Sequence, residues 1–168
     1  IPAQTPFTLT AKATDIDNDV ITYSFEQVDL GSASTSLESM KDDGLKPLFR
    51  SYKPSTIATR DFPVIDSILS GELVVGENYA TTNRELNFKV TARDQQGGIA
   101  IDAVKLTVLA NSSPFQLLSP SSSEPWFKSV NSTIQWDVAN TRDEEINCQY
   151  VNIDLSIDGG NTFTHRIA

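Results

Sequence analysis

Cysteine and histidine are each present once in this 168-residue chain. Cys148 therefore cannot form an intrachain disulfide, and the stability of the chain must come from packing, to which bound ions can add. His165 has no second histidine beside it and no cysteine pair to complete a zinc site. We expect it to be an exposed residue at the end of a strand.

Basic residues are also few. The chain has 13 Lys and Arg against 22 Asp and Glu, a formal net charge of −9. Nucleic acid is an unfavourable partner, because no basic surplus exists to replace the counterions of a phosphate backbone. An acidic surface suits hard cations such as calcium, although acidity also serves simply to keep a protein in solution.

Long apolar runs are missing, and so is an opening segment of the signal-peptide type. No stretch approaches the roughly 20 apolar residues that a membrane helix needs, so we expect no membrane insertion. Ile1 instead leads directly into a strand-like segment. We interpret the chain as an interior piece of a longer, processed protein that is secreted or displayed at a cell surface.

Motifs for catalysis are absent from the sequence. There is no nucleophile elbow, phosphate-binding loop or dinucleotide fingerprint, because Gly97-Gly98 and Gly159-Gly160 follow turn patterns rather than precede helices. The pairs Asp42-Asp43 and Glu144-Glu145 could supply the acid and base of a glycosidase, but adjacent carboxylates in polar loops are usually solvated. We expect no enzymatic activity from this part of the protein.

What the sequence does contain is strand periodicity. Apolar and polar residues alternate with a period of two, which is typical of strands with one buried face. The stretches that show this alternation are 7–13, 21–25, 86–92, 101–108, 134–138 and 151–157. The polar, proline-ended stretch 110–114 is the best domain boundary. We predict an all-β fold of two tandem β-sandwich modules, residues 1–110 and 114–168.

The interval of about 30–83 interrupts this rhythm and is predicted to be a long loop insertion in the first module. Its middle, from Pro47 to Pro54, contains aromatic and cationic residues. We interpret it as a flap packed over a sheet edge, with a binding surface as the alternative. Residues 62–69, followed by Ser70 and Gly71, predict one or two helical turns ended by the glycine, and no longer helix is expected.

The second module is short. Residues 114–168 amount to about 55 residues, whereas a complete two-sheet sandwich usually has about 100. Either the module continues in a longer protein or it closes by borrowing a strand edge. Asp158-Gly159-Gly160-Asn161 predicts a hairpin turn within it.

Two acidic turns are the best candidates for a functional site. Asp15, Asp17 and Asp19 crowd the first turn, and Asp94 lies in the second. Carboxylates this close repel one another unless a cation or solvent neutralises them, so the four residues predict a structural calcium site. The first turn is not an EF-hand loop, because Val20 occupies the position where that loop requires glycine. The alternative is a pair of solvated turns.

Exposed aromatic residues give a second candidate, a ligand surface for glycans or peptides. Its members would be Phe49, Tyr52 and Trp126. Trp136 is not included, because it alternates in phase with Ile134 and Val138 and is predicted to belong to the core.

Several of these stretches also carry a family likeness. They include the two acidic turns, 13–19 and 92–98, the segment Thr59-Arg60-Asp61-Phe62-Pro63 and the run 153–160. Together they resemble the region downstream of the catalytic domain in secreted bacterial reprolysin-type zinc metallopeptidases. The sequence departs from the family pattern at Asn18, where glycine is usual, and at Phe25, where tryptophan is expected.

The resemblance implies a cadherin-like or PKD-like module followed by a partial immunoglobulin-like module, with calcium held at Asp15, Asp17 and Asp94. It also implies a zinc peptidase domain upstream as the partner, whose zinc-binding helix has no counterpart in these residues. We therefore expect a non-catalytic accessory region that stiffens the enzyme or presents it to a protein or polysaccharide surface. The alternative is an adhesin or carbohydrate-binding module.

Overall fold

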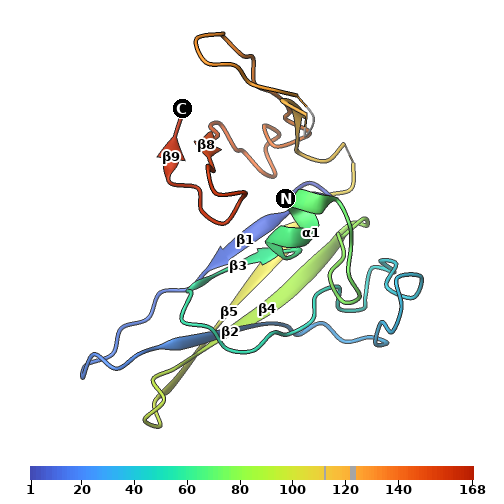
Figure 1. The fold of residues 1–168 in the computed structure, drawn as a ribbon. Helices are drawn as coiled ribbons and strands as arrows, with labels where there is room; N and C mark the ends of the chain where they lie inside the picture. The colour runs from blue at the N-terminus through green and yellow to red at the C-terminus, as the bar shows by residue number, and fades with distance from the viewer. Residues whose placement is uncertain (112, 122–123) are drawn as a thin grey trace.

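The computed structural model describes residues 1–111, 113–121 and 124–168 of an all-β chain with small antiparallel sheets (Figure 1). In the first part of the chain the strands are β1 (Phe7–Thr10), β2 (Thr22–Gln27), β3 (Thr59–Phe62), β4 (Arg84–Arg93) and β5 (Ile99–Val108), with a short helix, α1 (Ile65–Ser70). The later strands are β6 (Gln116–Ser119), β7 (Gln135–Asp137), β8 (Asp154–Leu155) and β9 (His165–Arg166).

Two sheets make up the first part. One pairs β1 with β3, and the other has the order β2-β4-β5. The β4–β5 hairpin turns at residues 94–98, and Arg93 lies opposite Ile99. This agrees with the turn predicted from the sequence, and the alternating stretches predicted around it are all strands.

Strand β3 corrects the sequence-based interpretation of the insertion. We expected the interval 30–83 to contain no strand, yet Thr59–Phe62 pairs with β1 in the register Phe7 to Phe62. The four-residue strand is short, and Arg60 occupies a position where an amphipathic pattern would show an apolar residue. The insertion is therefore an integral part of the first part of the chain.

Four phenylalanine rings form the centre of the core and join the two sheets. Phe62 lies 4.8 Å from Phe88 and 5.1 Å from both Phe7 and Phe49, measured between ring centroids. Most of these pairs are edge-to-face, the arrangement that aromatic quadrupoles favour. Because Phe7 and Phe62 come from one sheet and Phe88 from the other, this phenylalanine cluster holds the sheets face to face.

Helix α1 confirms the helical turns predicted from 62–70. Gly71 follows it with φ of 73°, a left-handed conformation, and its N–H donates to the carbonyl of Ser67 at 3.0 Å. Glycine accepts this conformation without a Cβ penalty, so the helix ends where the sequence predicts.

The second part of the chain is much less packed. Its strands pair as β6 with β7 and β8 with β9, and no hydrophobic residue described between 113 and 168 is fully buried. The alternation at 134–138 forms β7. Within the predicted strand 151–157 only Asp154–Leu155 forms a strand, and Ile153 adds backbone hydrogen bonds to Ile167 and Ala168. A strand needs a partner along its whole length, and β9 supplies only two residues. His165 lies in β9 and is exposed.

The second part contacts the first at several points. The N–H of Phe115 donates to Thr5 Oγ1 at 3.0 Å, and Asn140 Nδ2 donates to Asn111 Oδ1, in the connecting stretch, at 2.5 Å. Gly160 packs so closely on the Leu69 side chain of α1 that a Cβ there would overlap it. We call these contacts the joint.

Candidate functional site

The first acidic turn is closed by its own side chain. Asp15 Oδ1 accepts hydrogen bonds from the N–H groups of Asp17 at 2.9 Å and Asp19 at 3.0 Å. Asn18 has φ of 61°, a left-handed conformation that asparagine tolerates better than most residues. The departure from the glycine of the family pattern therefore leaves the turn intact.

The second acidic turn is closed in the same way. Asp94 Oδ1 accepts from the N–H groups of Gln96 and Gly98, each at 2.8 Å. The hydrogen bond from Gln96 lowers the pKa of the Asp94 carboxyl below its ordinary value, and the bond from Gly98 adds to this. Each turn thus binds its principal carboxylate with backbone amides.

The two glycines of this turn have different roles. Gly97 has the positive φ that the hairpin requires, at 114°, but the other positive φ belongs to Gln95, at 68°, rather than to Gly98. Gly98 is needed for space, because a Cβ there would overlap the Asp94 carboxylate. Of the two glycines, Gly97 alone therefore has a positive φ.

The turns lie at the same end of the first part, beside the pairing of Thr22 with Arg93. Asp15 and Asp94 line one hollow of about 170 Å³, whereas Asp17 and Asp19 do not line it. Over the described residues, no three His, Cys, Asp or Glu side chains are grouped as a metal ion would need. The structure thus brings together two of the four predicted ligands.

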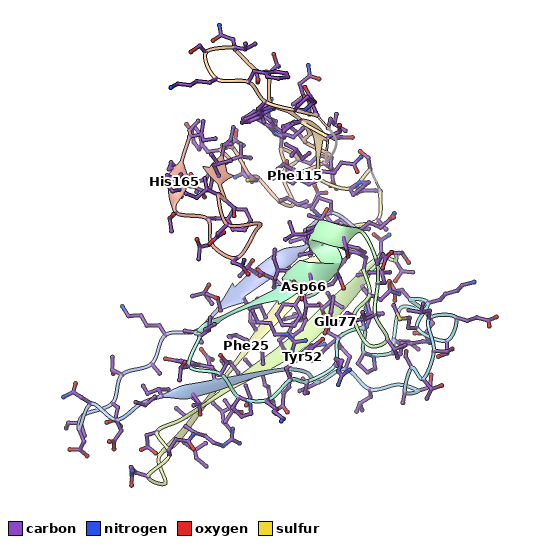
Figure 2. All side chains as sticks on the ribbon, in the orientation of Figure 1. Phe25, Tyr52, Asp66, Glu77, Phe115 and His165 are labelled. Carbon is purple, nitrogen blue, oxygen red and sulfur yellow. The ribbon has the colours of Figure 1, made fainter. Side chains whose placement is uncertain are left out.

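The predicted aromatic surface is divided between separate places. Phe49 is 5% exposed and belongs to the phenylalanine cluster, so it cannot serve as a surface platform. The ring of Tyr52 is covered by two cations, with Arg60 4.9 Å and Arg50 5.2 Å from its centroid. Figure 2 shows Tyr52 close to Glu77, far from the second part of the chain.

Trp126, by contrast, is 43% exposed and lines a hollow of about 290 Å³ in the second part. Trp136 also lines it, together with Phe115 and Leu117. The indole nitrogen of Trp136 is buried without a hydrogen-bond partner. Of the three predicted aromatic residues, Trp126 thus opens onto the larger hollow, whereas Tyr52 lines a smaller one of about 130 Å³.

A buried charge cluster was not predicted from the sequence. Asp42 Oδ1 accepts from Arg84 Nη1 at 2.7 Å, and both side chains are almost fully buried, with exposures of 0% and 2%. The second oxygen of Asp42 accepts from the N–H groups of Thr81 and Thr82 and from the Thr82 hydroxyl. Asp42 is therefore not the solvated loop carboxylate that we expected.

Further contacts extend this cluster to the sheet. Arg84 Nη2 donates to the carbonyls of Leu45 and Lys46 and lies 3.8 Å from Asp29 Oδ2. Asp29 in turn accepts from the N–H of Asn87 in β4. The inserted segment is thereby bound to the strand that carries Arg84.

A second buried ion pair lies within the insertion, between β3 and the segment after α1. Arg60 Nη2 lies 2.9 Å from Glu77 Oε1, and Glu77 Oε2 accepts from the N–H of Val64. Burial raises the pKa of the Glu77 carboxyl above its ordinary value, and the Arg60 guanidinium opposes that rise. Arg60 also lies 4.3 Å from the Phe62 centroid, so the pair is continuous with the phenylalanine cluster.

The predicted turn at 158–161 contains a strongly acidic carboxyl. Asp158 accepts from the hydroxyls of Thr162 and Ser156 and from the N–H of Thr162, and these bonds lower its pKa to about 2. The folded pKa lies below the ordinary 3.8, so the turn is stabilised above about pH 4 and loses this contribution as the pH falls toward 2.

We therefore expect a carboxyl NMR titration to place the Asp158 midpoint near 2. If the unsubstituted chain has a higher thermal unfolding midpoint than Asp158→Asn, the difference should decrease as the pH falls from about 4 to 2. A midpoint at the ordinary value of 3.8 would show that these hydrogen bonds do not form in solution.

Comparison of the sequence and structure with protein-family models, curated proteins and solved structures finds no match. Within residues 1–111, 113–121 and 124–168, no helix has the length and hydropathy to cross a membrane.

Proposed function

We propose that this chain is a non-catalytic accessory region of a secreted bacterial zinc metallopeptidase. It consists of two tandem β-sandwich modules, one cadherin-like or PKD-like at 1–110 and one partial and immunoglobulin-like at 114–168. The resemblance of the acidic turns and of the segment 59–63 to that family supports this proposal. The packing of the β1–β3 sheet on the β2-β4-β5 sheet through the phenylalanine cluster is compatible with a sandwich.

The proposed role is that of a stiff spacer that holds the peptidase against a protein or polysaccharide surface. The observation that carries this role is the attachment of the insertion to the β2-β4-β5 sheet. Asp42 pairs with Arg84 of β4, and Arg60, which is itself paired with Glu77, donates to the carbonyl of Phe25 in β2. A long surface loop without such contacts would be mobile. The joint adds contacts between the two modules, and its Leu69 belongs to the same insertion.

Calcium is proposed to stiffen the turn end of the first module. Asp15 and Asp94 line one hollow, and carboxylate oxygens are the ligands that calcium prefers. Two carboxylates fit a calcium ion that completes its shell of six to eight oxygens with backbone carbonyls and water. Asp17 and Asp19 add negative charge nearby without lining the hollow.

We expect 10 mM calcium, against chelator, to stabilise the chain to thermal and urea unfolding by about 1–3 kcal/mol, as for sites with dissociation constants of about 0.1–1 mM. The matched variant is Asp15→Asn with Asp94→Asn. Asparagine keeps the side-chain oxygen that closes each turn and removes only the charge. The variant should fold and should lose the response to calcium.

Magnesium at the same concentration is the control for ionic strength, because it demands a tighter octahedral shell. An equal calcium response in the unsubstituted chain and the double variant would remove this site from the proposal. The spacer role would then rest on the buried ion pairs alone.

Trp126 supports a second candidate function, a carbohydrate-binding or adhesin module. An exposed indole beside an apolar hollow of about 290 Å³ is suited to stacking against a sugar ring. Glycan-array binding that disappears in Trp126→Ala, but persists in the neighbouring exposed Phe127→Ala, would replace the spacer role with this one. Tyr52 is not part of this surface, because cations cover its ring.

A further inference from the structure

The segment 30–35, which follows β2 at the start of the insertion, is open to solvent (Figure 1). Leu30 is 90% exposed, and every other residue of the segment except Ser34 is exposed too. In the described part of the chain, residues 30–34 belong to no strand or helix and form no hydrogen bonds. The hydroxyl of Ser34 is buried but has no partner, so it does not hold the segment in place.

The chain is held firmly on both sides of this segment. Before it, Asp29 accepts hydrogen bonds from the N–H and from the side-chain amide of Asn87 in β4, at 3.1 and 2.6 Å. After it, Ser39 Oγ accepts from two backbone N–H groups, each at 3.0 Å. The unbonded backbone is therefore confined to residues 30–34.

Such a segment is suited to an endopeptidase, because these enzymes bind a substrate as an extended strand through its free backbone groups. The bond after Leu30 is obstructed, since Gly31 packs so closely on Lys46 that a Cβ there would overlap it. The next apolar side chain along the chain is Ala33, which is exposed. The bond after Ala33 is therefore the accessible one.

Alanine is common in the chain, but its other positions are protected. Ala100 and Ala103 are exposed, yet both lie in β5, where β4 pairs with the backbone. Ala168 is exposed and its backbone bonds to Ile153, and the remaining described alanines are at least partly buried. Among the described alanines, Ala33 alone combines an exposed side chain with an unbonded backbone.

A cut after Ala33 would divide both sheets of the first part of the chain between two fragments. Strands β1 and β2 lie before the cut, and β3, β4 and β5 lie after it. Because β1 pairs with β3 and β2 pairs with β4, each sheet contains strands of both fragments. Backbone hydrogen bonds would therefore join the fragments in each sheet.

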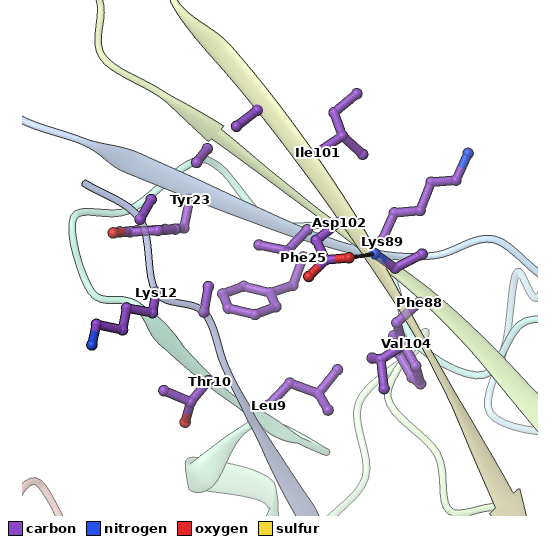
Figure 3. Close-up of a pocket in the computed structure, with 16 residues that line it drawn as sticks. Leu9, Thr10, Lys12, Tyr23, Phe25, Phe88, Lys89, Ile101, Asp102 and Val104 are labelled. Atoms are coloured by element: carbon purple, nitrogen blue, oxygen red, sulfur yellow. Dashed lines mark hydrogen bonds between the residues drawn. The ribbon is translucent and has the colours of Figure 1, made fainter. Parts of the chain in front are cut away.

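The core would be divided in the same way. Phe7 belongs to the first fragment, and the other three rings of the phenylalanine cluster belong to the second. Figure 3 shows more of this interface, where Leu9 and Phe25 of the first fragment line the same hollow, of about 390 Å³, as Phe88 of the second. The fragments stay together, because their separation exposes this apolar core to water.

We propose that the segment 30–35 is a processing site, at which an endopeptidase with a pocket for alanine cuts after Ala33 and leaves the two fragments assembled. Hydrolysis adds water across the Ala33–Ser34 peptide bond, so Ala33 acquires a carboxylate and Ser34 an ammonium group. The observation that carries the proposal is the position of this exposed, unbonded backbone between strands that pair across it. Cleavage makes the protein a complex of two chains with one fold.

The probe is an elastase, which cuts after alanine and other small residues. Limited digestion of the folded chain, followed by mass spectrometry, should give a fragment that ends at Ala33 and one that begins at Ser34 as the first products from residues 1–110. The two fragments should elute together in size-exclusion chromatography without denaturant and separately in urea. The circular dichroism of the cut chain should match that of the uncut chain.

Ala33→Glu tests the choice of bond, because a charged side chain does not enter a small apolar pocket. Cleavage after residue 33 should slow by at least about tenfold. The matched control is Thr56→Glu, since Thr56 is also exposed in a loop of the insertion. This control should be cut after Ala33 as fast as the unsubstituted chain, and both variants should fold because both positions are at the surface.

Unfolding of the cut chain should depend on protein concentration, because its two fragments separate when they unfold. The urea midpoint should rise with concentration for the cut chain and stay constant for the uncut chain. A constant midpoint for the cut chain would contradict the proposal.

The proposal would also be overturned by a first cut elsewhere in residues 1–110 while the bond after Ala33 stays intact. Fragments that elute separately without denaturant would overturn it, and so would equal rates of cleavage after residue 33 in Ala33→Glu and the unsubstituted chain.

Discussion

Phe62→Ala is expected to destabilise the chain by about 3–5 kcal/mol, a large part of the 5–15 kcal/mol available to a typical domain. Phe62 is fully buried and contacts the other three rings of the phenylalanine cluster. The substitution leaves a cavity between the two sheets, because the rigid neighbouring rings cannot collapse into it. Urea unfolding followed by circular dichroism measures the change.

Leu30→Ala is the matched control, because Leu30 lies in the same insertion but is 90% exposed. It should change the free energy of unfolding by no more than about 0.5 kcal/mol. The loss in free energy of unfolding for Phe62→Leu should lie between those of Phe62→Ala and Leu30→Ala, since leucine removes less volume than alanine. A loss below about 1 kcal/mol for Phe62→Ala would mean that the Phe62 ring does not pack between the sheets.

Arg84→Ala is expected to cost a similar amount, about 3–5 kcal/mol, for an electrostatic reason. It leaves the buried Asp42 carboxylate without its cation, and the loop carbonyls of Leu45 and Lys46 without their donor. Arg84→Met keeps most of the side-chain volume, so a comparable loss in Met and Ala variants would assign the cost to charge rather than to packing.

The exposed pair of Lys105 and Glu85 provides the comparison. Its atoms are as close as those of Arg84 and Asp42, at 2.7 Å, but both side chains are more than half exposed. Glu85→Ala should therefore cost less than about 1 kcal/mol, and salt should diminish its effect. Equal costs for Arg84→Ala and Glu85→Ala would contradict the buried position of the Asp42 cluster.

The elements that the sequence predicts well are those with local signals. β1, β2, β4 and β5 follow from period-two alternation, and α1 ends at Gly71 because glycine there adopts a left-handed conformation. The 94–98 turn is predicted by its glycines. Each of these predictions depends on residues that are neighbours in the chain.

The features that escaped prediction depend on distant partners. Arg60 in β3 is stabilised by Glu77, and Asp42 is stabilised by Arg84, so neither residue shows in its own segment why it is buried. Residues Thr59–Phe62 would show strand alternation if position 60 were apolar. Arg60 occupies that position, so the pattern is not visible in the sequence. In a single sequence, nothing indicates which cation a buried carboxylate will meet.

The candidate calcium site could be predicted from the sequence only in part. The sequence places Asp15 and Asp94 in turns after pairing strands, and the structure brings both to one hollow. Asp17 and Asp19 were predicted to join them because of their crowding in the turn and, for Asp17, because of the family resemblance. Spacing does not determine direction in a turn, and here the turn is closed by Asp15 Oδ1, which accepts from the backbone of both residues.

The partners of the first strands have a consequence for the order in which the protein folds during synthesis. β1 cannot pair until Phe62 has left the ribosome, β2 must wait for residues 88–93, and Ile1 bonds to Thr107. Contacts this distant in sequence delay folding, because the chain loses the entropy of closing a long loop before any stabilising contact forms. The first part of the chain therefore cannot assemble strand by strand. It acquires its native fold only once the β4–β5 hairpin has emerged.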